Sequence, residues 1–259
     1  MALVSIITPS YNSALLIVST IQSVISQTFT DWEMIVVDDC SKDNSVEVIQ
    51  SFVDFESRIK LIKLTENSGA AVARNTAIEA AQGRYIAFLD SDDVWLPYKL
   101  EKQIDFMLSN NYSFAYSAYG KINENNKVIG NVSVPTKVSY ESLLKVNSIG
   151  CSTAIYDMSF FGKVYMPLIR KRQDLGLWLK LLKQTEYAFG IDETLAQYRL
   201  RPDSISANKI DAAKFTWHLY RNVENISLIK ASYYFSHYAI NGVLRTKFPR
   251  FTKLLGILK

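Results

Sequence analysis

Short apolar runs alternate with amphipathic stretches along the first 95 or so residues of the chain. Residues 3–8 and 32–37 are almost continuously apolar and are followed by proline or by acidic residues, which is typical of strands buried on both faces of a parallel sheet. Residues 15–27 instead repeat apolar positions at helical spacing. In chain order, the pattern predicts strands at 3–8, 32–37, 59–64 and 85–89, and helices at 15–27, 45–55 and 70–81.

Such an alternation of strands with helices predicts a parallel sheet joined by right-handed crossovers. We expect Gly83 to mark the end of the helix over 70–81. The rest of the chain is less regular. Its pattern predicts helices at 97–109, 140–145 and 173–183, strands at 112–120 and 188–198, a hairpin-like turn at 123–126, and aromatic helices from about 211 onward. The expected class is α/β, a mostly parallel sheet flanked by helices with a helical C-terminal extension.

Composition places the chain among globular proteins, with 48% apolar and 21% charged residues in a length of 259. No apolar run reaches 18 residues, so no membrane-spanning helix is expected. The N-terminus lacks a basic region and reads as a first strand rather than a signal peptide. The chain has two cysteines, which argues against a disulfide framework and favours a cytoplasmic location.

The net charge of +4 is distributed unevenly. No acidic residue follows Glu224, whereas six basic residues do, so the rest of the chain carries 23 basic against 25 acidic residues. This asymmetry predicts a local anionic partner and not a nucleic-acid-binding protein. Because aromatic residues accompany these cations, we expect the extension to bind an anionic membrane surface. The alternative is a helical cap that packs on the domain and turns its basic residues to solvent.

Three carboxylates stand within four positions, at Asp90, Asp92 and Asp93, directly after the apolar run 85–89. Charge at the end of a buried strand is costly unless it is paired or bound to metal. Carboxylate oxygens suit Mg²⁺ or Mn²⁺, and ligands of open α/β sheets bind at the carboxyl ends of strands. The segment therefore predicts a divalent-metal site. The alternative is a loop whose acids cap the next helix.

The ends of three predicted strands, at 9–11, 38–39 and 90–93, should meet at one edge of the sheet, and a nucleotide fits there. Asp39 can accept the imide N–H of a uracil base and Tyr11 can stack on it, while a metal held by the acidic cluster bridges the phosphates. The first strand is not followed by Gly-x-Gly-x-x-Gly, and the chain has no P-loop motif. These absences argue against a dinucleotide oxidoreductase and a P-loop NTPase.

Five segments together resemble the large family-2 group of inverting glycosyltransferases, which have a GT-A (Rossmann-like) fold. They are residues 4–12 (VSIITPSYN), 36–39 (VVDD), 67–75 (NSGAAVARN), 88–93 (FLDSDD) and 171–180 (KRQDLGLWLK). The resemblance spans roughly residues 3–206. It implies a GT-A domain at 1–207, with a nucleotide-binding half at about 1–95 and an acceptor-binding half at about 96–207, followed by the extension at 208–259.

The resemblance also implies a nucleotide-sugar donor, usually UDP-linked, and Mn²⁺ or Mg²⁺ as cofactor. Asp92, the last residue of the Asp-x-Asp signature, would bind the metal, and Asp174 matches the catalytic base. Residues 198–201 are similar to a loop that closes over the diphosphate. The residues expected at the donor site are Pro9, Tyr11, Asp39, Arg74, Asp90, Ser91, Arg199 and Arg201.

Several of these residues also have plainer interpretations. Asp174 stands in the first turn of a predicted helix, where an acid favours the helix dipole. Arg74 follows an Ala-rich stretch and can simply pair with a neighbouring acid. Arg199 and Arg201 can be surface charges, and Asp38 can be structural, because one acid of the pair is enough for a base contact. The resemblance implies that Asp93 would support the metal ligand Asp92 without binding the metal itself.

The sequence therefore predicts a metal-dependent, inverting glycosyltransferase that extends a surface polysaccharide such as O-antigen or capsule. Its acceptor would be a glycan or a lipid-diphosphate-linked sugar at the cytoplasmic face of the membrane. The alternatives are a nucleotidyltransferase and a non-catalytic module that keeps the fold. A nucleotidyltransferase needs a basic phosphate-binding motif near the first strand, and a haloacid-dehalogenase-type phosphatase needs a nucleophile there. This chain has Pro-Ser-Tyr-Asn at 9–12.

Overall fold

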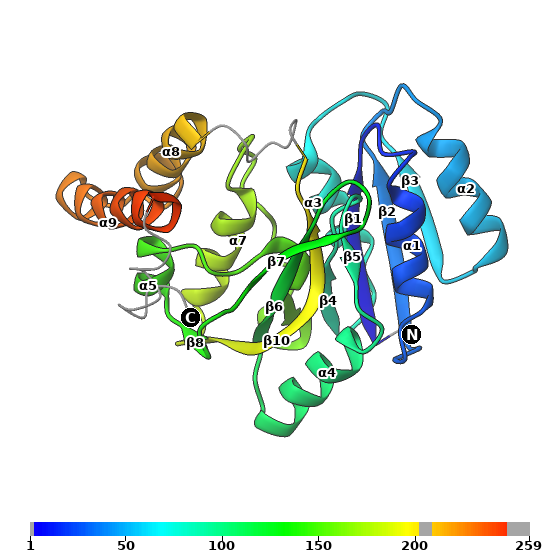
Figure 1. Ribbon diagram of the computed structural model, residues 1–259, viewed down its shortest axis with the longest axis horizontal. Helices are drawn as coiled ribbons and strands as arrows, with labels where there is room; N and C mark the ends of the chain where they lie inside the picture. The colour runs from blue at the N-terminus through cyan, green and yellow to red at the C-terminus, as the bar shows by residue number, and fades with distance from the viewer. Residues whose placement is uncertain (1–2, 202–208, 248–259) are drawn as a thin grey trace.

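A computed structural model describes residues 3–201 and 209–247, which form a sheet covered by helices on both faces (Figure 1). The basic residues at 250, 253 and 259 lie outside the described residues. The N-terminal segment is a strand, as predicted, and the element boundaries of the first half agree with the prediction to within about three residues.

The N-terminal half of the sheet is parallel, in the order β3-β2-β1-β4. Its strands are β1 (Val4–Ser10), β2 (Trp32–Asp38), β3 (Ile59–Lys63) and β4 (Tyr85–Phe88). Because β1 lies between β2 and β4, the carboxyl ends of these three strands open on one edge. The predicted convergence of residues 9–11, 38–39 and 90–93 is therefore confirmed.

The other half of the sheet is mixed. Beyond β4 the order is β9-β6-β10-β5, with β7 on β6 and β8 on β10. The long strands β6 (Phe114–Ile122) and β10 (Ala188–Arg199) are parallel to each other, as their predicted apolar runs allow. The sequence did not predict the short strands β5 (Val94–Trp95), β7 (Val128–Val132), β8 (Lys137–Val138) and β9 (Ile155–Asp157). Each has only two to five residues, and none carries an uninterrupted apolar run like that of β4.

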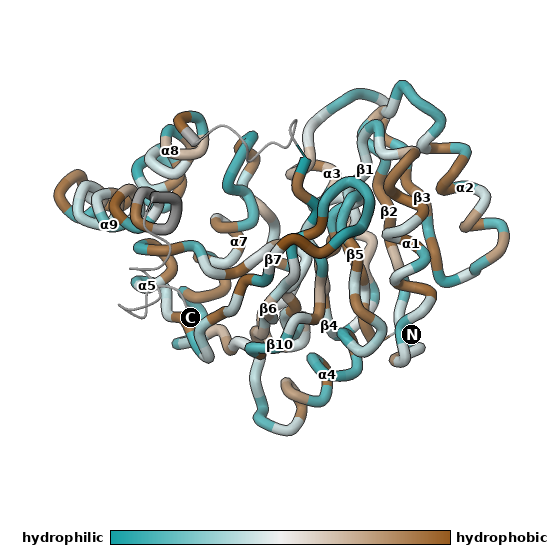
Figure 2. The backbone as a smooth tube through the Cα atoms, in the orientation of Figure 1, coloured by the Kyte–Doolittle hydropathy of each residue, from teal (hydrophilic) through white to brown (hydrophobic). Residues whose placement is uncertain are grey.

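Two apolar layers sandwich the sheet, because successive strand residues point to opposite faces. Ile7 and Phe88 join one core, and their neighbours Ile6 and Ala87 join the other. Figure 2 shows apolar residues concentrated along the central strands, while α4 alternates between polar and apolar positions. The first core packs α3 (Ala70–Ala80), α5 (Tyr140–Lys145), α6 (Met158–Phe161) and α7 (Gln173–Leu182), and the second packs α1 (Ile17–Ile25), α2 (Ser45–Phe55) and α4 (Lys99–Asn110).

Gly83 has a different role from the one the sequence predicted. Helix α3 ends at Ala80, and its C-cap Ala81 is already extended. Gly83 follows in ordinary backbone, where a Cβ atom would lie 2.6 Å from the backbone nitrogen of Ser5. Glycine is therefore needed here because the chain passes against β1, and not because a helix ends in the left-handed conformation.

The C-terminal extension packs on the rest of the molecule. It consists of α8 (Lys209–His218), a π-helical turn (Leu219–Val223) and α9 (Leu228–Lys247), beside α7 and α5 in Figure 1. Leu219, Tyr220 and Ala231 are fully buried in the same core as Trp178 of α7. Glu224 joins this contact, since it accepts a hydrogen bond from Tyr140 Oη at 2.6 Å. Among the described residues, no helix has the length and apolar character needed to cross a bilayer.

Candidate active site

One cavity of about 1620 Å³ opens at the carboxyl edge of the parallel strands. Its lining extends from Pro9 to Asn241, so it brings together residues that are far apart in the sequence. The predicted site residues that line it are Pro9, Tyr11, Asp39, Arg74, Asp90, Ser91, Asp92, Asp174 and Arg201. Arg199 alone among the predicted site residues is not part of this lining.

The ends of β1 and β2 form one wall of the cavity. Tyr11 is 44% exposed there, so its ring is free to stack on a planar group. Asp39 is buried, and its two carboxylate oxygens accept the backbone N–H groups of Ser68 at 2.7 Å and Gly69 at 2.8 Å. Each of these oxygens keeps a further lone pair. Asp39 therefore fixes the turn before α3 and can still accept a hydrogen bond from a ligand.

Asp38 is structural, the interpretation that the sequence left open. Its Oδ1 atom accepts the backbone N–H of Ser41 at 2.9 Å, within the loop that leads to α2. Its side chain is buried and does not line the cavity.

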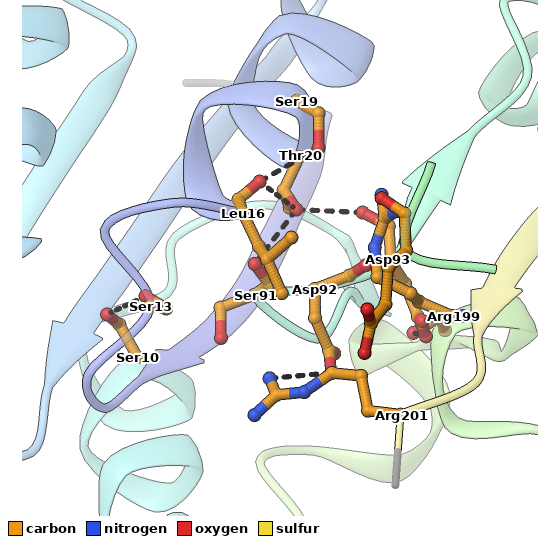
Figure 3. Close-up of polar contacts among 12 residues, drawn as sticks. Ser10, Ser13, Leu16, Ser19, Thr20, Ser91, Asp92, Asp93, Arg199 and Arg201 are labelled. Atoms are coloured by element: carbon orange, nitrogen blue, oxygen red, sulfur yellow. Dashed lines mark hydrogen bonds and ion pairs between the residues drawn. The ribbon is translucent and has the colours of Figure 1, made fainter. Parts of the chain in front are cut away.

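Two hydroxyl groups hold the acidic segment after β4 in place through hydrogen bonds. Thr20 Oγ1 donates to the carbonyl oxygens of Ser91 and Asp93, at 3.0 Å and 2.8 Å (Figure 3). Ser152 Oγ donates to Asp93 Oδ2 at 2.5 Å, and the carboxylate of Asp93 is 1% exposed. Burial, and then repulsion by Asp92 and Asp90, raises the pKa of Asp93 well above its usual value. Asp93 thus anchors the loop, while Asp90 and Asp92 face the cavity.

Arg74 connects the acidic segment with the region of Asp174. Its Nη2 contacts Asp90 Oδ1 at 2.5 Å, and its Nη1 donates to Gln173 Oε1 at 2.9 Å. Burial alone would lower the pKa of Arg74, but the charge of Asp90 outweighs it and raises the pKa. The expected pairing with an acid is present, and Arg74 is also a lining residue of the cavity.

The two arginines at the end of β10 lie in different environments. Arg199 is 2% exposed, and its Nε donates to the carbonyl of Asp92 at 2.8 Å. Its Nη1 donates to the carbonyl of Asn123 in the β6–β7 turn. Arg201 lines the cavity, and its Nη1 lies 3.3 Å from Asp92 Oδ2 (Figure 3). Arg201 is therefore the arginine that is exposed to the cavity, whereas Arg199 supports the acidic segment.

Asp174 enters the cavity from the first turn of α7. Arg172 precedes it as the N-cap residue, in the left-handed conformation with φ of 67°. That backbone turn carries Gln173 toward Arg74 and brings Asp174 to the same cavity as Asp90 and Asp92. The acid can favour the helix dipole and face a ligand at the same time.

The donor set of the acidic segment suits a divalent cation. Burial, followed by repulsion from Asp90, raises the pKa of Asp92. A cation beside the two carboxylates would oppose this shift, because an opposite charge stabilises the ionised form. In the part of the chain that the structure describes, no three acidic, His or Cys side chains form a ready metal cluster. Mg²⁺ needs only one or two carboxylates when substrate phosphates and water supply the remaining ligands. Asp92 and Asp90 therefore fit such a metal.

A family model described as "Glycosyl transferase family 2" matches residues 5–166. This range contains the ends of β1 and β2 and the acidic segment after β4. The chain belongs to glycosyl transferase family 2. The resemblance noted in the sequence is thereby confirmed, and the protein is a glycosyltransferase.

Two curated relatives of this glycosyltransferase match nearly its full length. The putative teichuronic acid biosynthesis glycosyltransferase TuaG of Bacillus subtilis is 47% identical over 93% of this chain and 96% of its own. The Escherichia coli protein WfgD is 42% identical over 95% of this chain and 96% of its own. It is named a UDP-Glc:alpha-D-GlcNAc-diphosphoundecaprenol beta-1,3-glucosyltransferase.

Solved structures confirm the GT-A fold of the glycosyltransferase. S. aureus TarS in complex with UDP-GlcNAc aligns with a TM-score of 0.72 at 18% identity, over 98% of this chain and 76% of that one. The mannosyltransferase PcManGT of Pyrobaculum calidifontis, in complex with GDP-Man and Mn²⁺, aligns with a TM-score of 0.66 at 16% identity, over 98% and 79% of the two chains.

Sequence reasoning missed the residues that hold the site together. Thr20 supports the acidic segment from α1, and Ser152 supports it from the 3₁₀ turn at Cys151–Thr153. Gln173 accepts a hydrogen bond from Arg74, although these two residues are 99 positions apart. No local signal distinguishes such residues, because serine, threonine and glutamine are common at helix ends and on surfaces.

Proposed function

We propose that this glycosyltransferase moves a sugar from a UDP-sugar to a hydroxyl of a lipid-diphosphate-linked glycan, with inversion and with a divalent metal, during surface polysaccharide synthesis. The observation that carries the proposal is the shared cavity, which holds Asp39 and Tyr11, the pair Asp90 and Asp92, and Asp174. Asp39 and Tyr11 suit the base of a nucleotide, Asp90 and Asp92 suit a metal that binds its phosphates, and Asp174 suits an acceptor hydroxyl.

The base pocket supports a uridine nucleotide. Asp39 retains lone pairs toward the cavity, so it can accept the imide N–H that uracil presents. Tyr11 offers an exposed ring for stacking, and Pro9 lies beside it in the lining. The name of the relative WfgD specifies UDP-Glc as its donor, which supports the same class of donor here.

The transfer step follows from the position of Asp174. Its carboxylate accepts the proton of the acceptor hydroxyl while the oxygen bonds to the anomeric carbon. The bond from that carbon to the diphosphate oxygen breaks, and its electron pair leaves with the nucleoside diphosphate. Attack opposite the leaving group inverts the configuration. Arg201 can donate charge-assisted hydrogen bonds to the departing diphosphate. A metal held by Asp92 and Asp90 would neutralise charge on that group.

Membrane association completes the proposal, because lipid-linked acceptors lie in a bilayer. The extension exposes Leu228, Ile229 and Ile240 on α9, where Ile229 is 85% exposed, with Lys230 beside them. Apolar side chains next to cations suit the interface of an anionic membrane. The runner-up functions are weaker: membership of the family speaks against a nucleotidyltransferase, and the presence of Asp92 and Asp174 speaks against a non-catalytic module.

Calorimetric titration with UDP, with and without Mn²⁺, tests the donor site. Wild type should bind UDP more tightly with Mn²⁺, and Asp92→Ala should lose that dependence while binding metal-free UDP as wild type does. A variant of the anchoring residue, Asp93→Asn, serves as control for the fold of the acidic segment. If wild type binds no UDP under either condition, the donor assignment is wrong and other nucleoside diphosphates become the candidates.

A further inference from the structure

The cavity is larger than the donor needs. Its volume of about 1620 Å³ exceeds the range of about 300–1,000 Å³ typical of sites for one small molecule. The donor residues described above lie at or after the ends of β1, β2, β4 and β10, or on α3. The lining also includes residues of β8, α5, the segment before α7, and α9. In Figure 1 these elements lie on the opposite side of the molecule from β2 and α2.

Charge divides the cavity lining into two parts. All acidic lining residues lie at the strand ends or at Asp174. The lining segments from β8, α5 and the segment before α7 contribute no acid, and their cations are Lys137, Lys145, Arg170, Lys171 and Arg172. The charge of Lys171 is offset by Asp211 at 3.4 Å. The other four form no ion pair with a carboxylate among the described residues, so this part of the cavity favours an anion.

Arg172 is the cation that the fold holds most firmly. Its Nη2 donates to Tyr238 Oη at 2.6 Å, and its guanidinium carbon lies 5.5 Å from the centre of the Tyr238 ring. Its Nε is buried and has no hydrogen-bond partner in the described part of the chain. A buried donor without a partner is costly, and a ligand oxygen would satisfy it. Arg172 is thus fixed by α9 with part of its guanidinium still available.

Lys145 supplies a second cation that contacts the same helix. It ends α5, and its Nζ lies 5.4 Å from the centre of the Tyr233 ring of α9. His237 and Asn241 of α9 also line the cavity. The extension therefore forms a wall of this part of the cavity, in addition to packing on the core.

We infer that Arg172, held by Tyr238 and assisted by Lys145, binds the diphosphate of the acceptor. The inference rests on the proposed function and names the site for the acceptor's anionic group. Arg172 stands two residues before Asp174, so a diphosphate bound at Arg172 leaves its attached sugar to reach the base. Arginine suits this task because its planar fork matches phosphate oxygens.

The test compares two acceptors that differ only in the diphosphate: a short-chain alkyl diphosphate ester of α-GlcNAc, and the matching alkyl α-GlcNAc glycoside. With UDP-Glc as donor, Arg172→Gln should raise KM for the diphosphate acceptor at least tenfold. Its KM for UDP-Glc and its rate with the glycoside should stay within about twofold of wild type. Tyr238→Phe should raise the same KM by a smaller factor. Lys102→Gln removes a cation of α4, which pairs with Glu193 away from the cavity, and should change nothing.

Equal losses with both acceptors would overturn the inference, because Arg172 would then only position Asp174. No loss with either would overturn it as well. If wild type transfers no sugar, the proposed function fails in its donor or acceptor sugar, and a binding assay still decides the inference. In that assay decyl diphosphate is titrated into enzyme saturated with UDP and Mn²⁺. Equal affinity for wild type and Arg172→Gln would contradict the site, and a tenfold weaker affinity of the variant would support it.

Discussion

At the scale of single residues, Arg74 shows how one side chain joins two parts of the site. Its guanidinium bridges Asp90, which follows β4, and Gln173, which begins α7. Because Gln173 directly precedes Asp174, the position of the proposed base depends on a contact with the donor side. A substitution at Arg74 is therefore expected to affect both donor binding and transfer.

Replacement of Asp174 by asparagine tests the base directly. The amide keeps the size of the side chain but cannot accept the proton, so the transfer rate should fall by about 10²–10⁴. UDP binding should remain within about twofold of wild type, because Asp174 is not assigned to the donor site. Initial rates and calorimetry measure the two quantities. Full activity of the variant would exclude Asp174 as the base.

Glu33 is a residue whose charge supports the fold away from the site. It is 5% exposed, accepts hydrogen bonds from Ser5 Oγ at 2.6 Å and from the backbone N–H of Gln82 at 2.8 Å, and pairs with Lys60 at 2.7 Å. Burial alone would raise the pKa of Glu33, but the bonds from Lys60, Ser5 and Gln82 outweigh it and lower the pKa.

The pKa of Glu33 is lower in the folded than in the unfolded chain. The ionised carboxylate therefore makes its full contribution to the free energy of unfolding above the unfolded-state pKa of about 4.3. It is lost as the pH falls through the lower folded value. Wild type should exceed Glu33→Gln in free energy of unfolding by about 1–3 kcal/mol at pH 7. Urea titrations at several pH values should show this gap shrinking below about pH 5. A gap that is constant down to pH 3 would contradict the assigned contacts.

At the scale of elements, the sheet depends on a close approach between β1 and the chain that enters β4. A Cβ on Gly83 would overlap the backbone of Ser5, and backbone atoms cannot move aside easily. We predict that Gly83→Ala destabilises the protein by about 1–3 kcal/mol, measured by chemical denaturation. Gly130→Ala in β7, where nothing lies within 4 Å of the added Cβ, should stay within about 0.5 kcal/mol of wild type. Similar values for both variants would refute the argument.

At the scale of the whole molecule, the extension both packs on the core and carries the proposed membrane surface. Removing it would expose the core around Tyr220 and Ala231, so truncation cannot isolate membrane binding. Substitution of exposed side chains can isolate membrane binding. The double variant Ile229→Ser, Ile240→Ser should bind anionic phospholipid vesicles at least tenfold more weakly than wild type, since burying each isoleucine contributes about 1.5–3 kcal/mol.

Phe55→Ser is the matched control for that experiment, because Phe55 is 88% exposed on α2, far from the extension in Figure 1. Vesicle co-sedimentation should not distinguish this variant from wild type. If the double variant also sediments like wild type, the extension is not the surface that meets the membrane.

The sequence by itself determined the parallel half of the sheet and the chemistry at its edge. Strands buried on both faces are read from their own apolar residues, and their ends carry the acids and Tyr11. Tertiary structure alone decided the short strands β5 to β9 other than β6, the role of Gly83, and the pairing of Arg74 with Gln173. It also decided that α9 forms a wall of the cavity. The physical reason is that a local pattern reports how one segment is buried, whereas these features depend on which distant segment lies against it.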